Sequence, residues 1–317
     1  MTGMKEGGGL HRPVMTAEVI EFLRPSRGQV IFDGTFGTGG HAQDILGHIA
    51  PGGRLIAVDR DPHAFQKAKE RSLEVVEAAS CHCKNYRDIR SILADEGIDE
   101  VNGILLDLGV SSLQLDDGGR GFSFRQDGPL DMRMGPDAPA PASELLNTLS
   151  EEEISRIIYQ YGEERWARRI ASFIVRARER QPVETTGQLV EIIRNAVPAG
   201  ARRGRAHPAR RTFQALRIAV NSELEDLKEG LQETATCLAM SGRMVVLTYH
   251  SLEDRIVKST FGSLAKGSDL PPGTSPSRPS FRLLNRKVVR PSPEETGANP
   301  RSRSAKLRAI ERVSGGI

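Results

Sequence analysis

The stretch Asp33-Gly34-Thr35-Phe36-Gly37-Thr38-Gly39-Gly40-His41 joins a short β-rich run to a helix through a glycine-rich turn. Its glycines lack the Cβ atoms that would keep a ligand away from the backbone, and the start of the following helix offers free N–H donors. The turn therefore predicts a nucleoside site at one edge of an α/β sheet. Because Gly37, Gly39 and Ala42 also satisfy the dinucleotide-binding pattern, a nicotinamide-dependent oxidoreductase is an alternative.

On both sides of this turn, β-rich runs alternate with amphipathic segments through the first third of the chain. This alternation is typical of βαβ units and predicts an α/β fold with a mainly parallel, Rossmann-like sheet. We predict strands at residues 30–33, 54–59, 74–83 and 103–108, and helices at 41–50, 62–71 and 86–95.

The alternation stops after residue 108, and residues 143–197 show helical periodicity only. We predict helices at 143–149, 150–161, 163–179 and 186–196, with Ser150 and Glu153 forming a capping box at the second of these. The α/β pattern then resumes with a helix at 213–240 that stops at Ser241-Gly242, a strand at 243–249, a helix at 252–261, a loop at 266–279 and a strand at 305–313. The chain is therefore divided into a discontinuous α/β domain, 1–114 and 213–317, and an inserted, mainly helical domain, 115–212.

The composition excludes several classes of protein. The 317 residues are 38% hydrophobic and 27% charged, which excludes collagen, a coiled coil and disorder throughout the chain. The net charge of +3 is small, but five arginines lie in residues 202–211 with no acid between them, and residues 278–312 are also strongly basic. Such clusters suit a polyanion, and a solvated surface is the alternative.

Cys81, Cys83 and Cys237 are too few for a disulfide framework, and neither a signal-peptide pattern nor an apolar run of about 20 residues occurs. We therefore expect a cytoplasmic protein without membrane association. Cys81-His82-Cys83 lacks the second pair of ligands that a structural zinc site needs, so no metal is expected.

Two of the predicted strands have an aspartate at their carboxyl end. Asp59 is placed to accept hydrogen bonds from both hydroxyls of a ribose; capping the next helix is its alternative role, for which Asp61 is better placed. Tyr86 is placed to lie against an adenine, or to pack at the start of a helix. Asp107 ends an apolar strand, where an unpaired buried carboxylate is costly, so it should point into the crevice that binds the ligand.

At this point the sequence resembles the bacterial 16S ribosomal RNA cytosine-N4 methyltransferase family, MraW or RsmH. Besides the glycine-rich turn, the matching stretches extend in order over nearly the whole chain. They are His11-Arg12-Pro13-Val14, Asp59-Arg60-Asp61-Pro62, Leu105-Leu106-Asp107-Leu108-Gly109-Val110-Ser111-Ser112, Arg120-Gly121-Phe122-Ser123-Phe124, Asp127-Gly128-Pro129-Leu130-Asp131-Met132-Arg133-Met134, Tyr161-Gly162-Glu163-Glu164-Arg165, Arg211-Thr212-Phe213-Gln214-Ala215-Leu216-Arg217 and His250-Ser251-Leu252-Glu253-Asp254-Arg255.

The resemblance implies a class I S-adenosylmethionine-dependent methyltransferase. Its implied reaction moves a methyl group from S-adenosyl-L-methionine to the exocyclic amine of one cytidine in the decoding region of 16S rRNA, with the small ribosomal subunit as partner. The discontinuous domain would be the methyltransferase domain, and residues 115–212 the substrate-recognition domain. The oligomeric state is left open, a homodimer included. The implied cofactor contacts are Gly39, Gly40, His41, Asp59, Tyr86, Asp107 and Gln114.

Positioning supplies most of the catalysis in an in-line displacement at a sulfonium methyl. The cytosine amine is a poor nucleophile, and an acceptor that holds its N–H would activate it and later take a proton. We predict Asp107 and His250 as catalytic residues; a purely structural His250 is the alternative.

The aromatic residue that follows the acid in many amino-methyltransferases is absent after Asp107. A splayed base would therefore need another ring, and each candidate also suits core packing. The candidates are Phe122, Phe124, Phe213 and Tyr249. A ribosome-assembly factor that binds the cofactor without catalysis is the remaining alternative.

Overall fold

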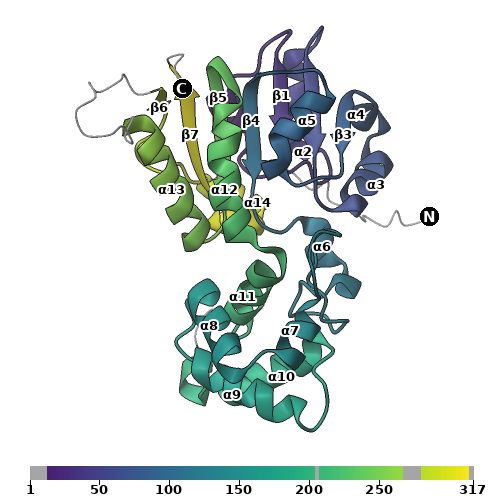
Figure 1. Cartoon of the computed structure of the whole chain (residues 1–317), viewed down its shortest axis with the longest axis vertical. Coiled ribbons are helices and arrows are strands. Elements are labelled where there is room, and N and C mark those ends of the chain that lie inside the picture. Colours follow the sequence, from purple (N-terminus) through teal and green to yellow (C-terminus); the bar gives the residue numbers. More distant parts are fainter. Residues whose placement is uncertain (1–12, 204–206, 267–279, 314–317) are drawn as a thin grey trace, which may run out of the picture. The chain divides into compact units, whose positions relative to one another are not determined.

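The computed structural model describes residues 13–203, 207–266 and 280–313, except for the side chains of residues 202 and 203 (Figure 1). Contacts between Cα atoms divide the chain into two compact units. The first unit contains Met1–Leu108 and Gly230–Ile317, and the second contains Gly109–Glu229. The first unit has the predicted α/β fold.

The first unit is built on one mixed sheet with the strand order β3-β2-β1-β4-β5-β7-β6. The first five of these strands are parallel, and β7 is antiparallel to both β5 and β6. The carboxyl ends of β1, β2, β4 and β5 therefore share one edge of the sheet. The strands are β1 Val30–Asp33, β2 Arg54–Val58, β3 Ala79–His82, β4 Val101–Asp107, β5 Leu238–Thr248, β6 Phe281–Leu283 and β7 Lys306–Arg312.

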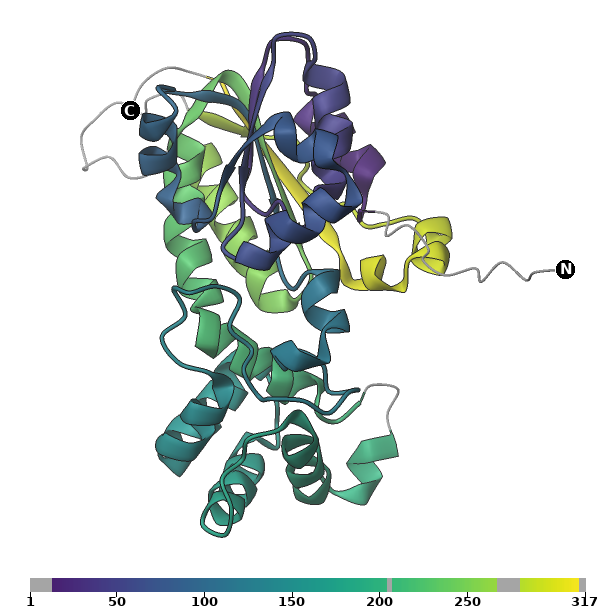
Figure 2. The same cartoon turned by 90° about the vertical axis from the view of Figure 1, so that its right-hand side faces the viewer.

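Helices cover both faces of this sheet, which explains why its central strands are almost continuously apolar. Side chains of α1 Thr16–Leu23, α2 Gly40–Ile49, α3 Pro62–Arg71 and α4 Leu73–Glu77 share one core with the strands. Figures 1 and 2 show α5 Ile89–Asp95, α12 Glu223–Thr236 and α13 Ser251–Lys266 on the opposite face.

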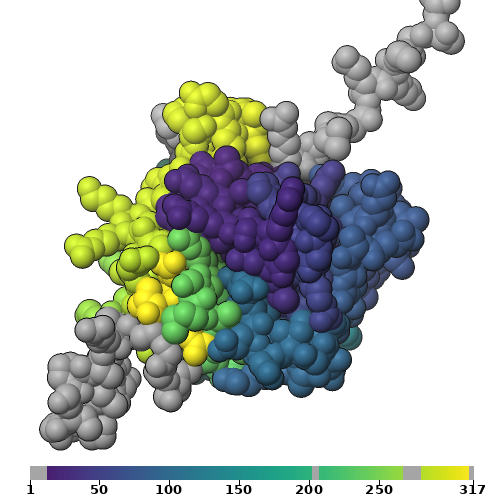
Figure 3. All heavy atoms as spheres, turned by 90° about the horizontal axis from the view of Figure 1, so that it is seen from above, coloured from purple at the N-terminus to yellow at the C-terminus, as the bar shows by residue number. Residues whose placement is uncertain are grey.

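The amino end of α1 is attached to the C-terminal part of the chain. The Met15 N–H donates to Oε1 of Glu295, on α14 Pro293–Ala298, at 2.7 Å. Figure 3 shows this purple N-terminal segment beside the yellow C-terminal segment. Pro13 lies against the glycine-rich turn, because a Cβ built on Gly40 would be 3.1 Å from the Pro13 ring. Pro13 thus packs on the predicted nucleoside site.

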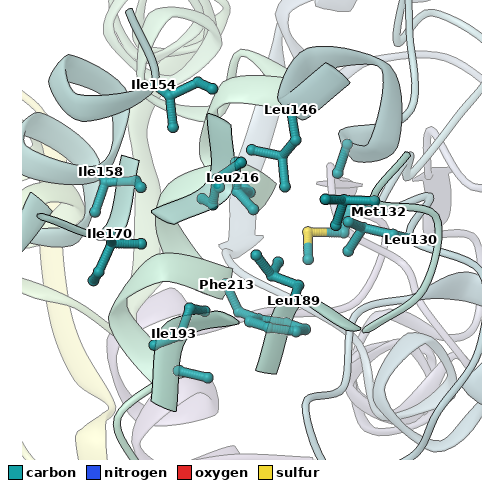
Figure 4. Close-up of a cluster of buried hydrophobic side chains, with 14 of the residues drawn as sticks. Leu130, Met132, Leu146, Ile154, Ile158, Ile170, Leu189, Ile193, Phe213 and Leu216 are labelled. Carbon is teal, nitrogen blue, oxygen red and sulfur yellow. The ribbon is translucent and has the colours of Figure 1, made fainter. Parts of the chain in front are cut away.

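The second unit is helical and has a core of its own (Figure 4). The apolar faces of α8, α9, α10 and α11 meet there with Leu130 and Met132 of the preceding loop. The predicted capping box of Ser150 and Glu153 is present at the start of α8. The helices are α6 Ser112–Asp116, α7 Ala142–Thr148, α8 Glu151–Gly162, α9 Ala167–Arg178, α10 Thr186–Ala196 and α11 Arg210–Asn221. No helix in the described part of the chain has the length and apolar composition to cross a membrane.

Two predicted elements are wrong in part. Residues 74–83 are not one strand, because α4 takes their first part, and Val75 and Val76 pack into the core. Tertiary packing overrides the β propensity of these valines. The predicted helix at 213–240 is broken at Ser222, whose φ is 51°, into α11 and α12. Its last residues belong instead to β5, which pairs Leu238 with Val101 of β4.

The unit boundaries also differ from the predicted ones. The helical unit begins at 109 rather than 115, and ends at 229 rather than 212. The second difference arises because Phe213 and Leu216 of α11 are buried in the helical core. The predicted loop at 266–279 lies almost entirely outside the described residues.

Candidate active site

The glycine-rich turn lies between the carboxyl ends of β2 and β4. The Gly34 N–H donates to the Leu105 carbonyl, and the Phe36 N–H donates to the Val58 carbonyl, both at 2.9 Å. Gly37 and Gly39 have φ values of +55° and +75°, which residues with a side chain rarely adopt. The requirement for glycine at these two positions therefore comes from the backbone of the turn itself.

Asp59 follows β2 and ties the turn to the start of α3. Its Oδ2 accepts from the Gly37 N–H and its Oδ1 from the Asp61 N–H, both at 2.8 Å. Burial raises the pKa of Asp59 to about 6, although the two N–H donors oppose this shift. Asp61 caps α3 by accepting from the His63 N–H at 3.1 Å, so Asp59 is not that cap.

Asp107, at the end of β4, lies between side chains from three different parts of the first unit. Its Oδ1 accepts from the Tyr249 hydroxyl at 2.7 Å, and its Oδ2 lies 3.5 Å from Nε2 of His41. Its backbone N–H donates to Oγ1 of Thr35, within the glycine-rich turn, at 2.6 Å. The turn and the end of β4 are thus fixed to each other.

The charges around Asp107 influence one another. Burial raises the pKa of Asp33 to about 7, against the lowering effect of His41. Burial lowers the pKa of His41, but the carboxylates of Asp107 and Asp33 outweigh it, and the pKa of His41 is raised overall. Burial and the charge of Asp107 raise the pKa of Tyr249 well above its usual value, so its hydroxyl stays a donor.

His41 carries the feature that best fits a bound cofactor. The side chain is buried at the start of α2, and its Nδ1 has no hydrogen-bond partner among the described residues. Buried polar atoms are rarely left unpaired, so an exception calls for a ligand or water. Together with the glycine-rich turn and Asp59, this nitrogen fits the polar groups of a nucleoside cofactor.

Tyr86 follows β3 and packs between the turn and α12. A Cβ on Gly34 would lie 2.8 Å from Cβ of Tyr86, and a Cβ on Gly230 would lie 2.8 Å from its ring. The packing role is therefore present, and contact with an adenine stays a prediction. Gln114 lies in the second unit, where it forms a capping box with Ser111 at the start of α6. Its contact with the cofactor also stays a prediction.

His250 lies against α13. Oε2 of the buried Glu253 accepts from the N–H groups of Tyr249 and His250, at 2.7 and 3.1 Å, and His250 Nε2 lies 3.1 Å from Glu253 Oε1. This arrangement favours the structural alternative for His250. Tyr249, rather than His250, contacts Asp107.

The four aromatic candidates have different surroundings. Phe122 and Phe213 are buried in the helical core, and Tyr249 is bound to Asp107. Phe124 is half-buried and stacks on His207. In the basic cluster at 202–211, Arg205 lies outside the described residues.

Three residues with contacts at this site, Asp33, Thr35 and Glu253, were not predicted as site residues. Asp33 could have been found by the argument used for Asp107, because it also ends an apolar strand next to the glycine-rich turn. No local signal marks Glu253, whose partners become visible only when β5 and α13 are folded.

Comparison with known proteins identifies the family. Residues 9–313 match the model of the MraW methylase family. The ribosomal RNA small subunit methyltransferase H of Geobacter sulfurreducens is 52% identical, over 96% of this chain and 99% of its own. Its namesakes from Geotalea uraniireducens and Heliobacterium modesticaldum are 50% and 48% identical, each over 96% of this chain and 98% of their own. These matches confirm the predicted methyltransferase and contradict the oxidoreductase alternative; the chain belongs to the MraW methylase family.

Proposed function

We propose that this protein transfers a methyl group from S-adenosyl-L-methionine to N4 of one cytidine in the decoding region of 16S rRNA. Membership of a methylase family supports methyl transfer, and the names of the relatives support the small-subunit RNA as substrate. The observation that carries the chemistry is the position of Asp107, between Tyr249 and His41 and bonded to the glycine-rich turn.

The cofactor supplies an electrophilic methyl group on a sulfonium, and the chain supplies binding and orientation. The glycine-rich turn lets the backbone approach the nucleoside. Asp59 has two carboxylate oxygens with lone pairs beyond those used by Gly37 and Asp61, and these can accept from ribose hydroxyls. The unpaired Nδ1 of His41 offers a further contact.

Asp107 would act on the cytosine amine. Its Oδ1 is held by the Tyr249 hydroxyl, so the carboxylate keeps one orientation. A fixed carboxylate can accept a hydrogen bond from the amine as it attacks, which stabilises the positive charge that develops on nitrogen. The amine then loses its proton, and the same carboxylate can receive it.

The second unit, 109–229, is assigned to substrate recognition in this proposal, and the substrate is the RNA of the small ribosomal subunit. The proposal includes a cytoplasmic location, where subunits assemble. Sedimentation of the purified protein will show whether a homodimer forms.

The test uses small subunits from a strain that lacks this protein. Incubation with the purified protein and methyl-labelled S-adenosylmethionine should give N4-methylcytidine at one position, identified by nucleoside analysis and mass mapping of RNA fragments. Asp107→Asn serves as the control for background transfer. Transfer to another atom or to large-subunit RNA would contradict the proposal, and binding without any transfer would support the assembly-factor alternative.

A further inference from the structure

We infer that Phe124, His207, Arg125 and Arg194 form a platform on which the RNA substrate stacks an unpaired base. The inference rests on the proposed function and adds a binding surface to it. All four residues, called the ring platform below, belong to the second unit. Phe124 and Arg125 precede α7, Arg194 lies in the last turn of α10, and His207 precedes α11.

The two rings of the platform are stacked. Their centroids are 4.7 Å apart, and their planes differ by 11°. Phe213, which is buried in the helical core, meets Phe124 edge-on at 5.8 Å and 81°. Phe124 is half-buried, whereas His207 is exposed. The core therefore fixes the stack from one side and leaves its outer ring accessible, as stacking of a splayed base requires.

His207 is suited to stacking because its ring is neutral. Burial lowers the pKa of His207, and the charges of Arg194 and Arg125 lower it further. Its Nδ1 accepts from the Ala209 N–H at 3.2 Å, so the ring proton is on Nε2. The ring thus keeps an N–H donor at its edge and presents an uncharged face to a base.

The charges that act on the ring of His207 are both positive. Arg125 and Arg194 are exposed, and their effect on His207 places both charges near its ring. From Arg165 to Arg211 the sequence contains twelve arginines against three glutamates. Charge of this kind binds phosphates. An acidic protein would satisfy the arginines but not the stacked rings, so the combination favours single-stranded RNA.

The test is the affinity of the full-length protein for a short, unstructured, fluorescein-labelled oligoribonucleotide, measured by anisotropy over a series of KCl concentrations. His207→Ala should weaken binding by about five- to 100-fold without changing the salt dependence, because it removes stacking only. His207→Phe should restore the affinity to within about threefold, because it keeps the ring.

The charged part of the platform has a different signature. Arg125→Gln with Arg194→Gln should lower the slope of log K against log salt by about 1.4, or ~0.7 for each phosphate contact. Arg156→Gln is the control for a single substitution, because this exposed arginine of α8 lies in the same unit, next to Glu153, and its loss removes one positive charge, as each of the two platform substitutions does. It should leave the salt slope unchanged.

The outcomes separate the platform from the proposed function. Wild-type affinity in His207→Ala, or failure of His207→Phe to restore binding, overturns the platform, even where the wild-type protein methylates small subunits. Absence of methyl transfer by the wild-type protein overturns the proposed function, whichever variants bind RNA. Normal binding of the naked oligoribonucleotide by His207→Ala, with lost binding of the assembled subunit, overturns the platform in favour of a protein contact.

Discussion

Asp107 makes three contacts that serve different purposes. Its backbone is bonded to Thr35, one carboxylate oxygen to Tyr249, and the other lies near His41. The backbone contact survives any side-chain substitution, so the shape of the glycine-rich turn can be separated experimentally from the charge of the carboxylate.

We expect Asp107→Asn to fold and to bind S-adenosylmethionine within about tenfold of the wild type, because Asn is nearly isosteric and keeps a carbonyl acceptor. Single-turnover methyl transfer should slow by about 100-fold or more, since Asn has no charge and cannot take a proton. Calorimetry measures the binding and rapid quench measures the transfer.

Tyr249→Phe provides the matched control, because it removes only the hydroxyl that holds Asp107. It should slow transfer less than Asp107→Asn does. If Asp107→Asn binds the cofactor weakly but transfers the methyl group normally at saturating cofactor, Asp107 is a cofactor ligand only. If Asp107→Asn shows normal binding and normal transfer, Asp107 takes no part in the chemistry.

Asp33 should make the stability of the protein depend on pH. The folded protein holds the Asp33 proton up to a pKa of about 7, whereas the unfolded chain releases it near the ordinary aspartate pKa of 3.8. Between these values the folded state binds more protons, so stability falls as the pH rises. Relative to the wild type, Asp33→Asn should therefore gain about 2 kcal/mol in the free energy of unfolding between pH 5 and pH 8.

Urea unfolding at both pH values, without cofactor, measures this gain. Asn keeps an oxygen that can accept from the Thr35 N–H, which Asp33 now binds at 3.2 Å. The same stability difference at both pH values would mean that Asp33 is ionised in the folded protein.

One residue at the junction of α11 and α12 has a strained backbone conformation. Ser222 is exposed and has a φ of 51°, a conformation that costs a non-glycine residue about 1 kcal/mol. Ser222→Gly should raise the free energy of unfolding by about 0.5 to 1 kcal/mol, and Ser222→Ala should not raise it. Urea unfolding midpoints compare the two variants, and a gain in both would assign the effect to something other than φ.

Helices whose first turn carries a capping residue or a proline could be predicted from the sequence. The bounds of α3 and α10 are those predicted, because Asp61 and Pro62 mark the start of α3, and Thr185 caps α10. The start of β5 could not be predicted, because its strand conformation depends on pairing with β4, far away in the sequence.

The same limit applies to the site. Asp59 and Asp107 were found because each stands at the end of a strand. The contact between Tyr249 and Asp107 was not predicted, because it depends on the register between β4 and β5. This register pairs Asp107 with Leu247, two residues before Tyr249. Only the folded sheet brings these side chains together.

At the scale of the whole molecule, hydrogen exchange can test whether Gln114 contacts the cofactor. Gln114 belongs to the second unit, whereas Asp107 belongs to the first. At 100 times its dissociation constant, S-adenosylhomocysteine should stabilise the state that binds it by about 2.7 kcal/mol. Hydrogen exchange should then slow in the glycine-rich turn and at the end of β4. We expect slower exchange in α6 as well, if Gln114 contacts the cofactor as the resemblance implies.

Peptides from α9 are the internal reference, because no predicted cofactor contact lies in that helix. Slower exchange in the turn with unchanged exchange in α6 would overturn the prediction for Gln114. Equal slowing in α6 and α9 would indicate general stabilisation of the helical unit instead.

The order of the segments along the chain affects how the protein is made. A ribosome completes β1 to β4, then the entire helical unit, and only afterwards β5, the neighbour of β4 in the sheet. At about 5 to 20 residues per second, about 7 to 28 s pass between the synthesis of β4 and that of β5, and one edge of β4 stays unpaired during this time. An open strand edge invites pairing with other chains. The nascent polypeptide is therefore most exposed to aggregation, and most in need of a chaperone, while its helical unit is emerging.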